Sequence, residues 1–356
     1  MIAIPAVLSN LRVARRLAAA LLAAPLLLGG CAVAPVSHTW GVPGPVTASF
    51  VMADGTRLGY RVWRPAGPPR AVVLALHGMN DSRDAWEVPG PAFAAAGIEM
   101  IAPDQRGFGS TEERGLWPGT AALVGDARRM VALIHEEYPD AKLYVMGESM
   151  GGAVAICLAA SSPSVPIDGT ILVAPAVWGR DEMNVFERAG LWLMVHVVPE
   201  MRVTGSIVQV TASDNRAAIW RLSTDPLTLH GTRWDAVKGL VDLMDAAEAG
   251  IGRIRGPVLF MYGGKDDLIP KRAARAAWRK LPEGVRAAYY PAAYHLMLRD
   301  HARAVPIEDV IAWMDDPAAK LPSGAEGTAR AWLAETVREV ISSPVLSSFQ
   351  GGLEAG

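Results

Sequence analysis

The chain of 356 residues contains little cysteine and no long block of charge of one sign. With only two cysteines, Cys31 and Cys157, it cannot carry a framework of disulfide bonds. The formal net charge is −2, so the charge balance gives no reason to expect a nucleic-acid partner. The hydrophobic fraction of 51% suffices for one large folded core, and any partner must be inferred from a specific site.

The N-terminal apolar run is too short for a membrane span. Residues 17–28 are twelve residues, whereas a transmembrane helix needs about 20. Arg12, Arg15 and Arg16 precede this run, and small residues follow it at Gly29 and Gly30. A basic segment, a short apolar segment and small residues before a cleavage point are typical of a secretory signal. Residues 1–30 are therefore predicted to be a signal peptide, and residues 31–45 a tether.

After residue 45, β-prone and helical segments alternate. Val46–Met52 and Leu58–Trp63 flank Asp54-Gly55, which predicts a hairpin at an antiparallel edge of a sheet. In the apolar runs that follow, polar and apolar residues do not alternate, which is typical of parallel strands covered on both faces. These runs are Ala71–Leu76, Ile98–Ala102, Leu143–Met146, Gly169–Ala174, Val258–Tyr262 and Arg286–Tyr290. Helical patterns such as Thr120–Tyr138 and Lys271–Leu281 separate them, so we predict an α/β fold with a mostly parallel, doubly wound sheet.

The alternation of strand and helix patterns stops between residues 176 and 249. Apolar residues occur there in loosely helical spacing that Pro199, Gly205 and Pro226 interrupt. We predict a helical cap at residues 176–249, inserted into a core of residues 46–175 and 250–316. Residues 317–356 are expected to form a C-terminal extension with a helix, because its apolar residues recur at helical spacing. These residues are Trp332, Leu333, Val337 and Val340.

The segment Gly147-Glu148-Ser149-Met150-Gly151 has the pattern Gly-x-Ser-x-Gly between an apolar strand and a helical run. In that setting the serine occupies a strained turn, and glycines on both sides let strand and helix approach. The turn exposes the hydroxyl, and the first amide of the helix, on Met150, points toward a developing oxyanion. Ser149 is therefore the candidate nucleophile.

A serine nucleophile needs a base, and the base needs a group that orients it. Asp266 directly follows one predicted strand and His295 follows the next, which gives the chain order Ser, Asp, His of the α/β-hydrolases. We predict His295 as the base and Asp266 as the orienting acid. Asp267 is the rival acid.

The loop after Leu76 is the candidate for the second oxyanion donor. Gly78 permits a close turn there, and the Met79 amide is the expected donor. His77 could compete as a base, but a histidine before glycine at this point is expected to support the loop by hydrogen bonding.

These motifs, together with Asp104-Gln105-Arg106-Gly107-Phe108-Gly109-Ser110, resemble the monoacylglycerol lipase and lysophospholipase branch of the α/β-hydrolases, also labelled serine aminopeptidase-like. The resemblance covers residues 46–315. It implies the α/β-hydrolase fold, a cap that admits one acyl chain, and a serine esterase with no cofactor and no metal. The loop that begins at Asp104 would be structural. In one departure, Glu148 stands where many lipases have histidine, which leaves the substrate open.

The favoured function is hydrolysis of a small-molecule acyl ester through an acyl-enzyme on Ser149. Monoacylglycerols, lysophospholipids and short-chain esters are not distinguished by the sequence. Peptide or amide hydrolysis is an alternative for the same residues, and a surface lipoprotein that only binds its ligand is another. The oligomeric state is left open.

Leu28-Gly29-Gly30-Cys31 resembles the lipobox of bacterial lipoproteins, in which the cysteine becomes the lipidated first residue. Lipidation of Cys31 would anchor the protein to the membrane of a bacterial cell envelope. An aspartate directly after the lipidated cysteine resembles a signal for retention in the inner membrane. This chain has Ala32 at that position, so the outer membrane is favoured. The alternative is an ordinary signal peptide with an incidental cysteine.

The cap segment from Leu191 to Val198 carries almost no charge. Its apolar surface exceeds what one buried helix face requires, so it would face either the core or an apolar substrate. We expect Trp192, Met194 and Val195 to bind the acyl chain of the substrate.

Overall fold

The computed structural model describes residues 46–203 and 210–341. The predicted signal peptide, Cys31 and the tether lie outside the described residues, as does the chain beyond residue 341. No helix in the described part of the chain is both long and apolar enough to cross a membrane.

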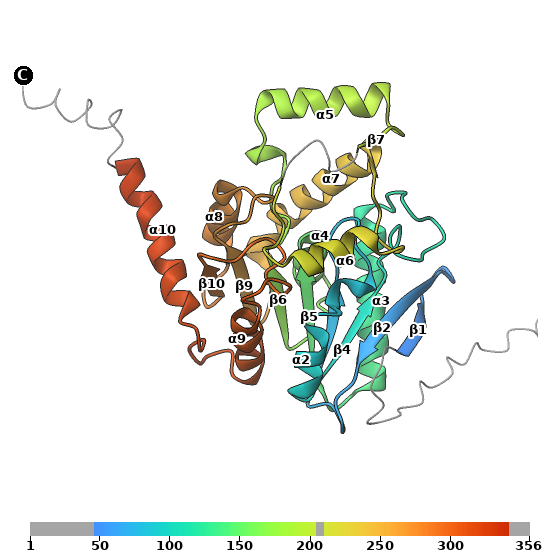
Figure 1. The fold of residues 1–356 in the computed structure, drawn as a ribbon, viewed down its shortest axis with the longest axis vertical. Coiled ribbons are helices and arrows are strands. Elements are labelled where there is room, and N and C mark those ends of the chain that lie inside the picture. The colour runs from blue at the N-terminus through green and yellow to red at the C-terminus, as the bar shows by residue number, and fades with distance from the viewer. Residues whose placement is uncertain (1–45, 204–209, 342–356) are drawn as a thin grey trace, which may run out of the picture. The chain divides into compact units, whose positions relative to one another are not determined.

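One eight-stranded sheet forms the centre, with the strand order β1-β2-β4-β3-β5-β6-β9-β10 (Figure 1). The strands are β1 (Val46–Val51), β2 (Arg57–Trp63), β3 (Ala71–Leu76), β4 (Ile98–Pro103), β5 (Lys142–Glu148), β6 (Gly169–Val173), β9 (Val258–Gly263) and β10 (Arg286–Tyr290). Strand β2 pairs antiparallel with both β1 and β4, and the other neighbours pair in parallel. The predicted mostly parallel α/β sheet with an antiparallel hairpin at its edge is confirmed.

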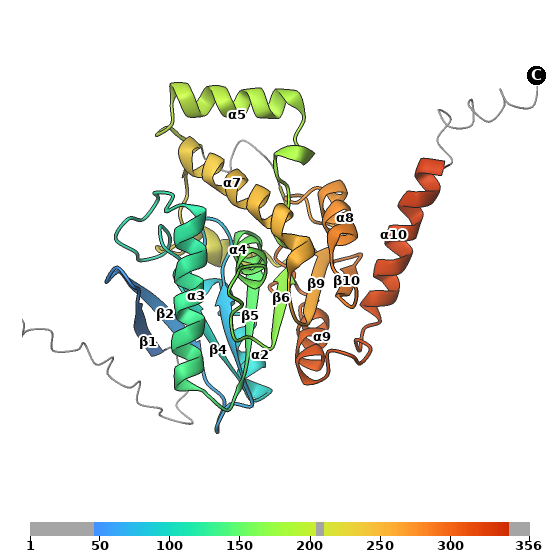
Figure 2. The same cartoon turned by 180° about the vertical axis from the view of Figure 1, so that it is seen from behind.

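Helices cover both faces of the sheet, so the central strands are buried on both sides (Figure 2). One apolar core includes side chains of α3 (Thr120–Glu137), α4 (Met150–Ala159), α7 (Trp234–Gly250) and α8 (Lys271–Lys280). The core on the other face includes side chains of α2 (Gly90–Ala95) and α9 (Ala304–Asp315). The parallel strands thus end at one common edge, where ligands bind in sheets of this kind.

The predicted cap region contains two helices that lie outside the core layers, α5 (Val185–Val197) and α6 (Arg216–Thr224). Helix α5 packs on α7, and α7 packs on α4 (Figures 1 and 2). Helix α6 follows, and the short strands β7 (Arg202–Val203) and β8 (Thr232–Arg233) pair antiparallel. Helix α7 shares the core cluster of α4 through Leu243 and Ala247, so this part of the region belongs to the core packing.

The C-terminal helix α10 (Ala325–Ile341) packs against β10, at the edge of the sheet. Trp332 stacks on Tyr289, with ring centroids 4.6 Å apart and an interplanar angle of 10°. The same ring meets the edge of Trp278 from α8, and the Arg275 guanidinium lies over it at 4.2 Å. The helix therefore covers an edge strand that would otherwise be open to pairing with another chain.

Replacing Trp332 by Ala should lower the free energy of unfolding by about 3–5 kcal/mol, because the change removes a buried aromatic ring from this cluster. Trp192→Ala is the matched control: Trp192 is 62% exposed on α5, whereas Trp332 is 5% exposed. Denaturant titration of both variants checks the prediction. Equal stability of the two would show that α10 is not anchored through Trp332.

Candidate active site

Ser149 lies at the turn between β5 and α4, with φ 53° and ψ −116°. A positive φ is strained for a residue other than glycine. The turn is held in place because the Ser149 amide donates to the Val173 carbonyl at 3.0 Å. A Cβ on Gly147 would lie 2.2 Å from the Gly151 carbonyl oxygen, and a Cβ on Gly151 would lie 2.1 Å from the Leu76 oxygen. Both glycines are therefore needed for strand and helix to approach.

His295 and Asp266 form a buried pair at the ends of neighbouring strands. The Nδ1 atom of His295 lies 2.8 Å from Oδ2 of Asp266. The other oxygen of Asp266 accepts hydrogen bonds from the amides of Leu268 at 2.8 Å and Ile269 at 2.9 Å. Because Nδ1 is engaged, Nε2 is the ring nitrogen left for a proton from serine.

The loop that carries Asp266 is supported by a buried tyrosine. The Tyr262 hydroxyl donates to the Ile269 carbonyl at 2.7 Å. Burial, together with the nearby Asp266 charge, raises the pKa of Tyr262 well above its ordinary value, so the phenol stays a donor. The rival acid, Asp267, is exposed, whereas Asp266 is buried against His295. The structure therefore brings Asp266, and not Asp267, to the histidine.

His77 supports the loop after β3 through both ring nitrogens. Its Nε2 accepts from the Gln105 amide at 3.0 Å, and its Nδ1 lies 2.8 Å from the Gly78 carbonyl oxygen. With both nitrogens occupied, His77 has none available to take the proton of Ser149. Gly78 lies against the nucleophile, because a Cβ there would be 3.4 Å from Cβ of Ser149.

The loop that begins at Asp104 is held together by hydrogen bonds to the Asp104 carboxylate. Asp104 accepts from the amide and hydroxyl of Ser110, both at 2.8 Å, and from the Arg83 amide at 2.8 Å. Gly109 has a φ of 59°, and a Cβ on it would lie 2.1 Å from the Asp104 carboxyl carbon. The residues of this motif therefore stabilise the backbone of the loop, and none of them lines the cavity that contains Ser149.

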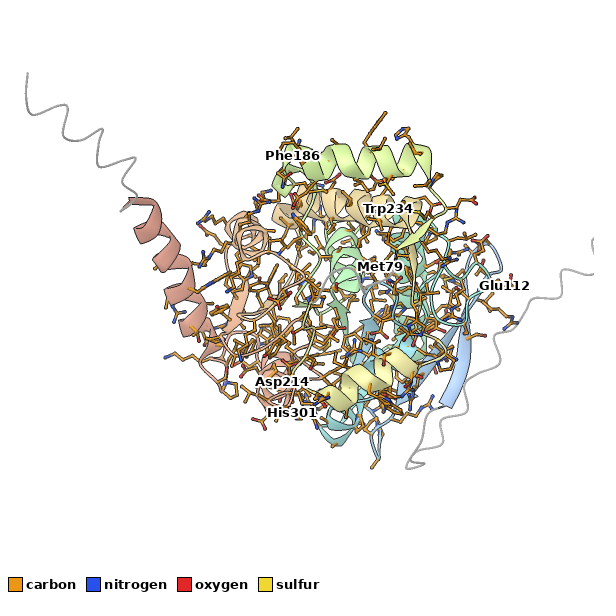
Figure 3. The ribbon with its side chains drawn as sticks, turned by 45° about the horizontal axis from the view of Figure 1, so that its top comes forward. Met79, Glu112, Phe186, Asp214, Trp234 and His301 are labelled. Carbon is orange, nitrogen blue, oxygen red and sulfur yellow. The ribbon has the colours of Figure 1, made fainter. Side chains whose placement is uncertain are left out.

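Ser149 and His295 open into one cavity of about 420 Å³, which Met79 also lines. Met79 lies near α4, close to the centre of the view in Figure 3. Met150 is the first residue of α4, and its amide is therefore one of those without an intrahelical acceptor. The predicted nucleophile Ser149, the base His295 and the oxyanion donor Met79 line one cavity, and the other donor, Met150, begins the helix beside it.

The structure does not bring Trp192, Met194 and Val195 to this cavity, which corrects the sequence-based expectation. Helix α5 packs on α7 with Leu191 turned inward, and Trp192 is 62% exposed. Phe186, on the same helix, lies at the outer edge of the molecule in Figure 3. Helix α7 lies between α5 and α4, and no residue of α5 lines the cavity that contains Ser149.

Other cap residues, which the sequence did not indicate, line the cavity. Ile219 and Leu222 of α6 and Leu229 supply apolar contact, and Thr228, His230 and Thr232 supply polar contact. Asn80 links the loop after β3 to the cap region. Its side-chain amide donates to the Thr232 hydroxyl at 2.6 Å, and its backbone carbonyl accepts from the Leu229 amide at 2.8 Å. No local pattern marks these residues, because they meet only in the folded chain.

Within the described ranges, no three residues of His, Cys, Asp or Glu are grouped so that they could hold a metal ion. The chemistry visible at this site is that of a serine, a histidine and a carboxylate. Such a set transfers an acyl group to serine and then to water.

Comparison with known proteins agrees with this geometry. The chain is 27% identical over 269 residues to a monoacylglycerol lipase of Mycolicibacterium smegmatis, covering 75% of this chain and 95% of that protein. It is 26% identical over 263 residues to a monoglyceride lipase of Rattus norvegicus, covering 73% and 86%.

Two solved structures share the fold. The monoacylglycerol lipase of Paleococcus ferrophilus has a TM-score of 0.61 at 22% identity, covering 72% of this chain and 98% of that one. A soluble variant of monoglyceride lipase from Saccharomyces cerevisiae has a TM-score of 0.66 at 19% identity, covering 79% and 98%. The model of the family described as "Serine aminopeptidase, S33" matches residues 67–302, more than half of the chain. The chain therefore belongs to this family and to the monoacylglycerol lipase-like branch of the α/β-hydrolases.

Proposed function

We propose that this protein hydrolyses the carboxylic esters of monoacyl lipids through an acyl-enzyme on Ser149. One observation carries the proposal: Ser149 and His295, the latter bonded to Asp266, line a single cavity with an apolar wall. The relatives named monoacylglycerol lipase or monoglyceride lipase support the same substrate class.

The reaction follows from the placement of these groups. Ser149 Oγ attacks the ester carbonyl while Nε2 of His295 takes its proton, and Asp266 stabilises the imidazolium. The oxyanion that forms is stabilised by the amides of Met79 and Met150. His295 then gives the proton to the leaving alcohol, and a water molecule activated by the same nitrogen releases the fatty acid.

The charge of the cavity favours a neutral head group over a phosphate. No lysine or arginine occurs among the described residues that line it, whereas Asp81 and Glu148 both do. An anionic phosphate would meet carboxylates and find no guanidinium or ammonium partner. The hydroxyls of a glycerol head group could instead bond to Asn80, Thr232 and His230. We therefore favour monoacylglycerol over lysophospholipid.

Leu222→Asn should raise KM for a sixteen-carbon ester and leave KM for an acetyl ester nearly unchanged. Each methylene that loses apolar contact is worth about 0.8 kcal/mol, or about a fourfold change in affinity. Leu193→Asn is the matched control, because Leu193 is 51% exposed on α5 and does not line the cavity. Steady-state kinetics on a chain-length series of esters and amides checks the prediction.

The same series tests the proposal itself. Faster cleavage of amides than of esters by the wild type would favour an amide hydrolase of the same fold. Turnover of neither class would favour a protein that only binds its ligand. Equal effects of Leu222→Asn on short and long esters would show that α6 does not line the acyl passage.

Cys31 is the proposed site of lipid attachment, which would place the enzyme at the outer membrane of a bacterial cell envelope. The signal-like sequence before it supports this proposal. The exposed apolar side chains of α5 also suit a protein that works beside lipid. They include Val185, Phe186, Trp192, Leu193 and Val197.

Cys31→Ser should release the protein from membranes, because lipidation requires the sulfur atom. Fractionation of expressing cells and intact-mass measurement of the wild type and the variant check this outcome. A wild-type protein that is soluble and carries no lipid mass would contradict the anchoring proposal while leaving the enzymatic proposal untouched.

A further inference from the structure

Three buried charged side chains connect the loops that carry the candidate catalytic groups. Nη2 of Arg299 donates to Oδ2 of Asp81 at 2.7 Å and to Oε1 of Glu148 at 2.5 Å. The side chains of Arg299, Asp81 and Glu148 are 6%, 8% and 2% exposed. One nitrogen atom thus bonds two carboxylates that are almost fully buried.

Each of these residues is a near neighbour of a group that acts on the ester. Glu148 directly precedes Ser149, and Asp81 follows the oxyanion loop residue Met79 by two positions. Arg299 follows His295 by four positions. The two hydrogen bonds join the nucleophile turn, the oxyanion loop and the histidine loop at one point.

The backbone around Arg299 is itself fixed, so the side chain can act as an anchor. Its amide donates to the Leu296 carbonyl at 2.8 Å, and its carbonyl accepts from the Asn215 side chain at 2.8 Å. The next residue, Asp300, accepts from the Ser213 hydroxyl at 2.5 Å and from the Tyr294 amide at 2.8 Å. The histidine loop is thereby closed around His295.

The charge of Arg299 is also needed at this place. Two carboxylates that line the cavity would oppose the negative charge that develops on the ester oxygen. Burial alone would lower the pKa of Arg299, but the facing carboxylates Asp81 and Glu148 outweigh it and raise that pKa, so the guanidinium stays charged. Arg299 therefore compensates one of the two negative charges.

We propose that Arg299 is a positioning residue that keeps Ser149, the oxyanion loop and His295 in mutual register by holding Glu148 and Asp81. The inference rests on the proposed function for its reaction. It also explains how this chain accommodates Glu148, a charged residue, directly before the nucleophile.

Arg299→Met should lower kcat about 100-fold and leave KM within about threefold, because small displacements of reacting groups cost about that factor. The same factor should appear in the rate constant for labelling of Ser149 by a fluorophosphonate, a probe that needs the catalytic groups but no lipid. Both rates are expressed per folded molecule, with unfolding followed by circular dichroism.

Arg106→Met is the matched control for the loss of a partly buried arginine that pairs with two carboxylates. Arg106 is 14% exposed and pairs with Asp126 and Asp54. It belongs to the structural loop after β4 and does not line the cavity. This variant should lose stability and keep the labelling rate of its folded fraction.

Glu148→Gln and Glu148→Ala test the hydrogen bond if Arg299→Met does not fold. The glutamine carbonyl can still accept from Arg299, so Glu148→Gln should slow labelling less than about fivefold, whereas Glu148→Ala should slow it about 30-fold. Arg299→Lys should fall between Arg299→Met and the wild type.

Three results would overturn the inference: wild-type labelling by Arg299→Met, equal losses in Glu148→Gln and Glu148→Ala, or a rise in KM without a fall in kcat. A wild type that reacts with the fluorophosphonate and cleaves no monoacyl ester would overturn the proposed substrate only. The labelling rates would then still decide the role of Arg299.

Discussion

Ser149→Ala is expected to hydrolyse esters about 10⁶-fold more slowly than the wild type. The hydroxyl is the group that forms the acyl-enzyme, and among the described residues that line the cavity with His295 the other serine is Ser223, on α6. Stability should change little, because serine and alanine experience the same positive φ of 53° in the turn.

Initial rates on a monoacylglycerol and on a chromogenic acetyl ester measure the effect. Thermal unfolding of both proteins controls for loss of structure. A variant that retains more than a few per cent of wild-type kcat would remove Ser149 from the role of nucleophile.

Asp266→Asn is expected to lower kcat by about 10⁴. In an asparagine at this position the single side-chain oxygen would keep the bonds from the two backbone amides, so the NH₂ group would face Nδ1 and the imidazole would lose its charged partner and its required tautomer. The bonds from Leu268 and Ile269 would still have an oxygen acceptor, and the loop should keep its fold.

Asp267→Asn is the matched control for this change. The neighbouring carboxylate is exposed and is not the one that faces His295. Its replacement should leave kcat within about twofold. If Asp267→Asn lowered kcat as much as Asp266→Asn, the assignment of the orienting acid would be wrong.

The sheet could be predicted from the sequence because its signals are local. The run Ala71–Leu76 is apolar throughout and is the observed β3, and Asp54-Gly55 lies in the turn between β1 and β2. The nucleophile turn also has a local signal, the pattern Gly-x-Ser-x-Gly. The contact that requires Gly147 is local, with Gly151, whereas the contact that requires Gly151 is with Leu76 at the end of β3.

The substrate cavity could not be predicted in the same way. An apolar helical pattern shows that α5 has apolar surface, but it does not show which face is covered. In the structure Leu191 faces inward and Trp192 faces solvent, while Ile219 and Leu222 of α6 line the cavity. The choice between α5 and α6 depends on how each helix packs after the chain leaves β6.

The arginine network is a third case. Arg299 is separated in sequence by 218 residues from Asp81 and by 151 residues from Glu148. No spacing rule connects residues at such separations. Only the parallel order of β3, β5 and β10, which brings the ends of these strands to one edge, places the three side chains together.

The central claim is that Ser149 is the residue that receives the acyl group, and the location of a covalent label tests it most directly. Wild-type protein would be treated with a fluorophosphonate, digested, and its peptides analysed by mass spectrometry, while hydrolysis of a monoacylglycerol is followed in parallel. We predict one adduct, on the peptide that contains Ser149, and a loss of hydrolysis in proportion to the labelled fraction. An adduct on another residue, or full hydrolysis by fully labelled protein, would contradict the claim.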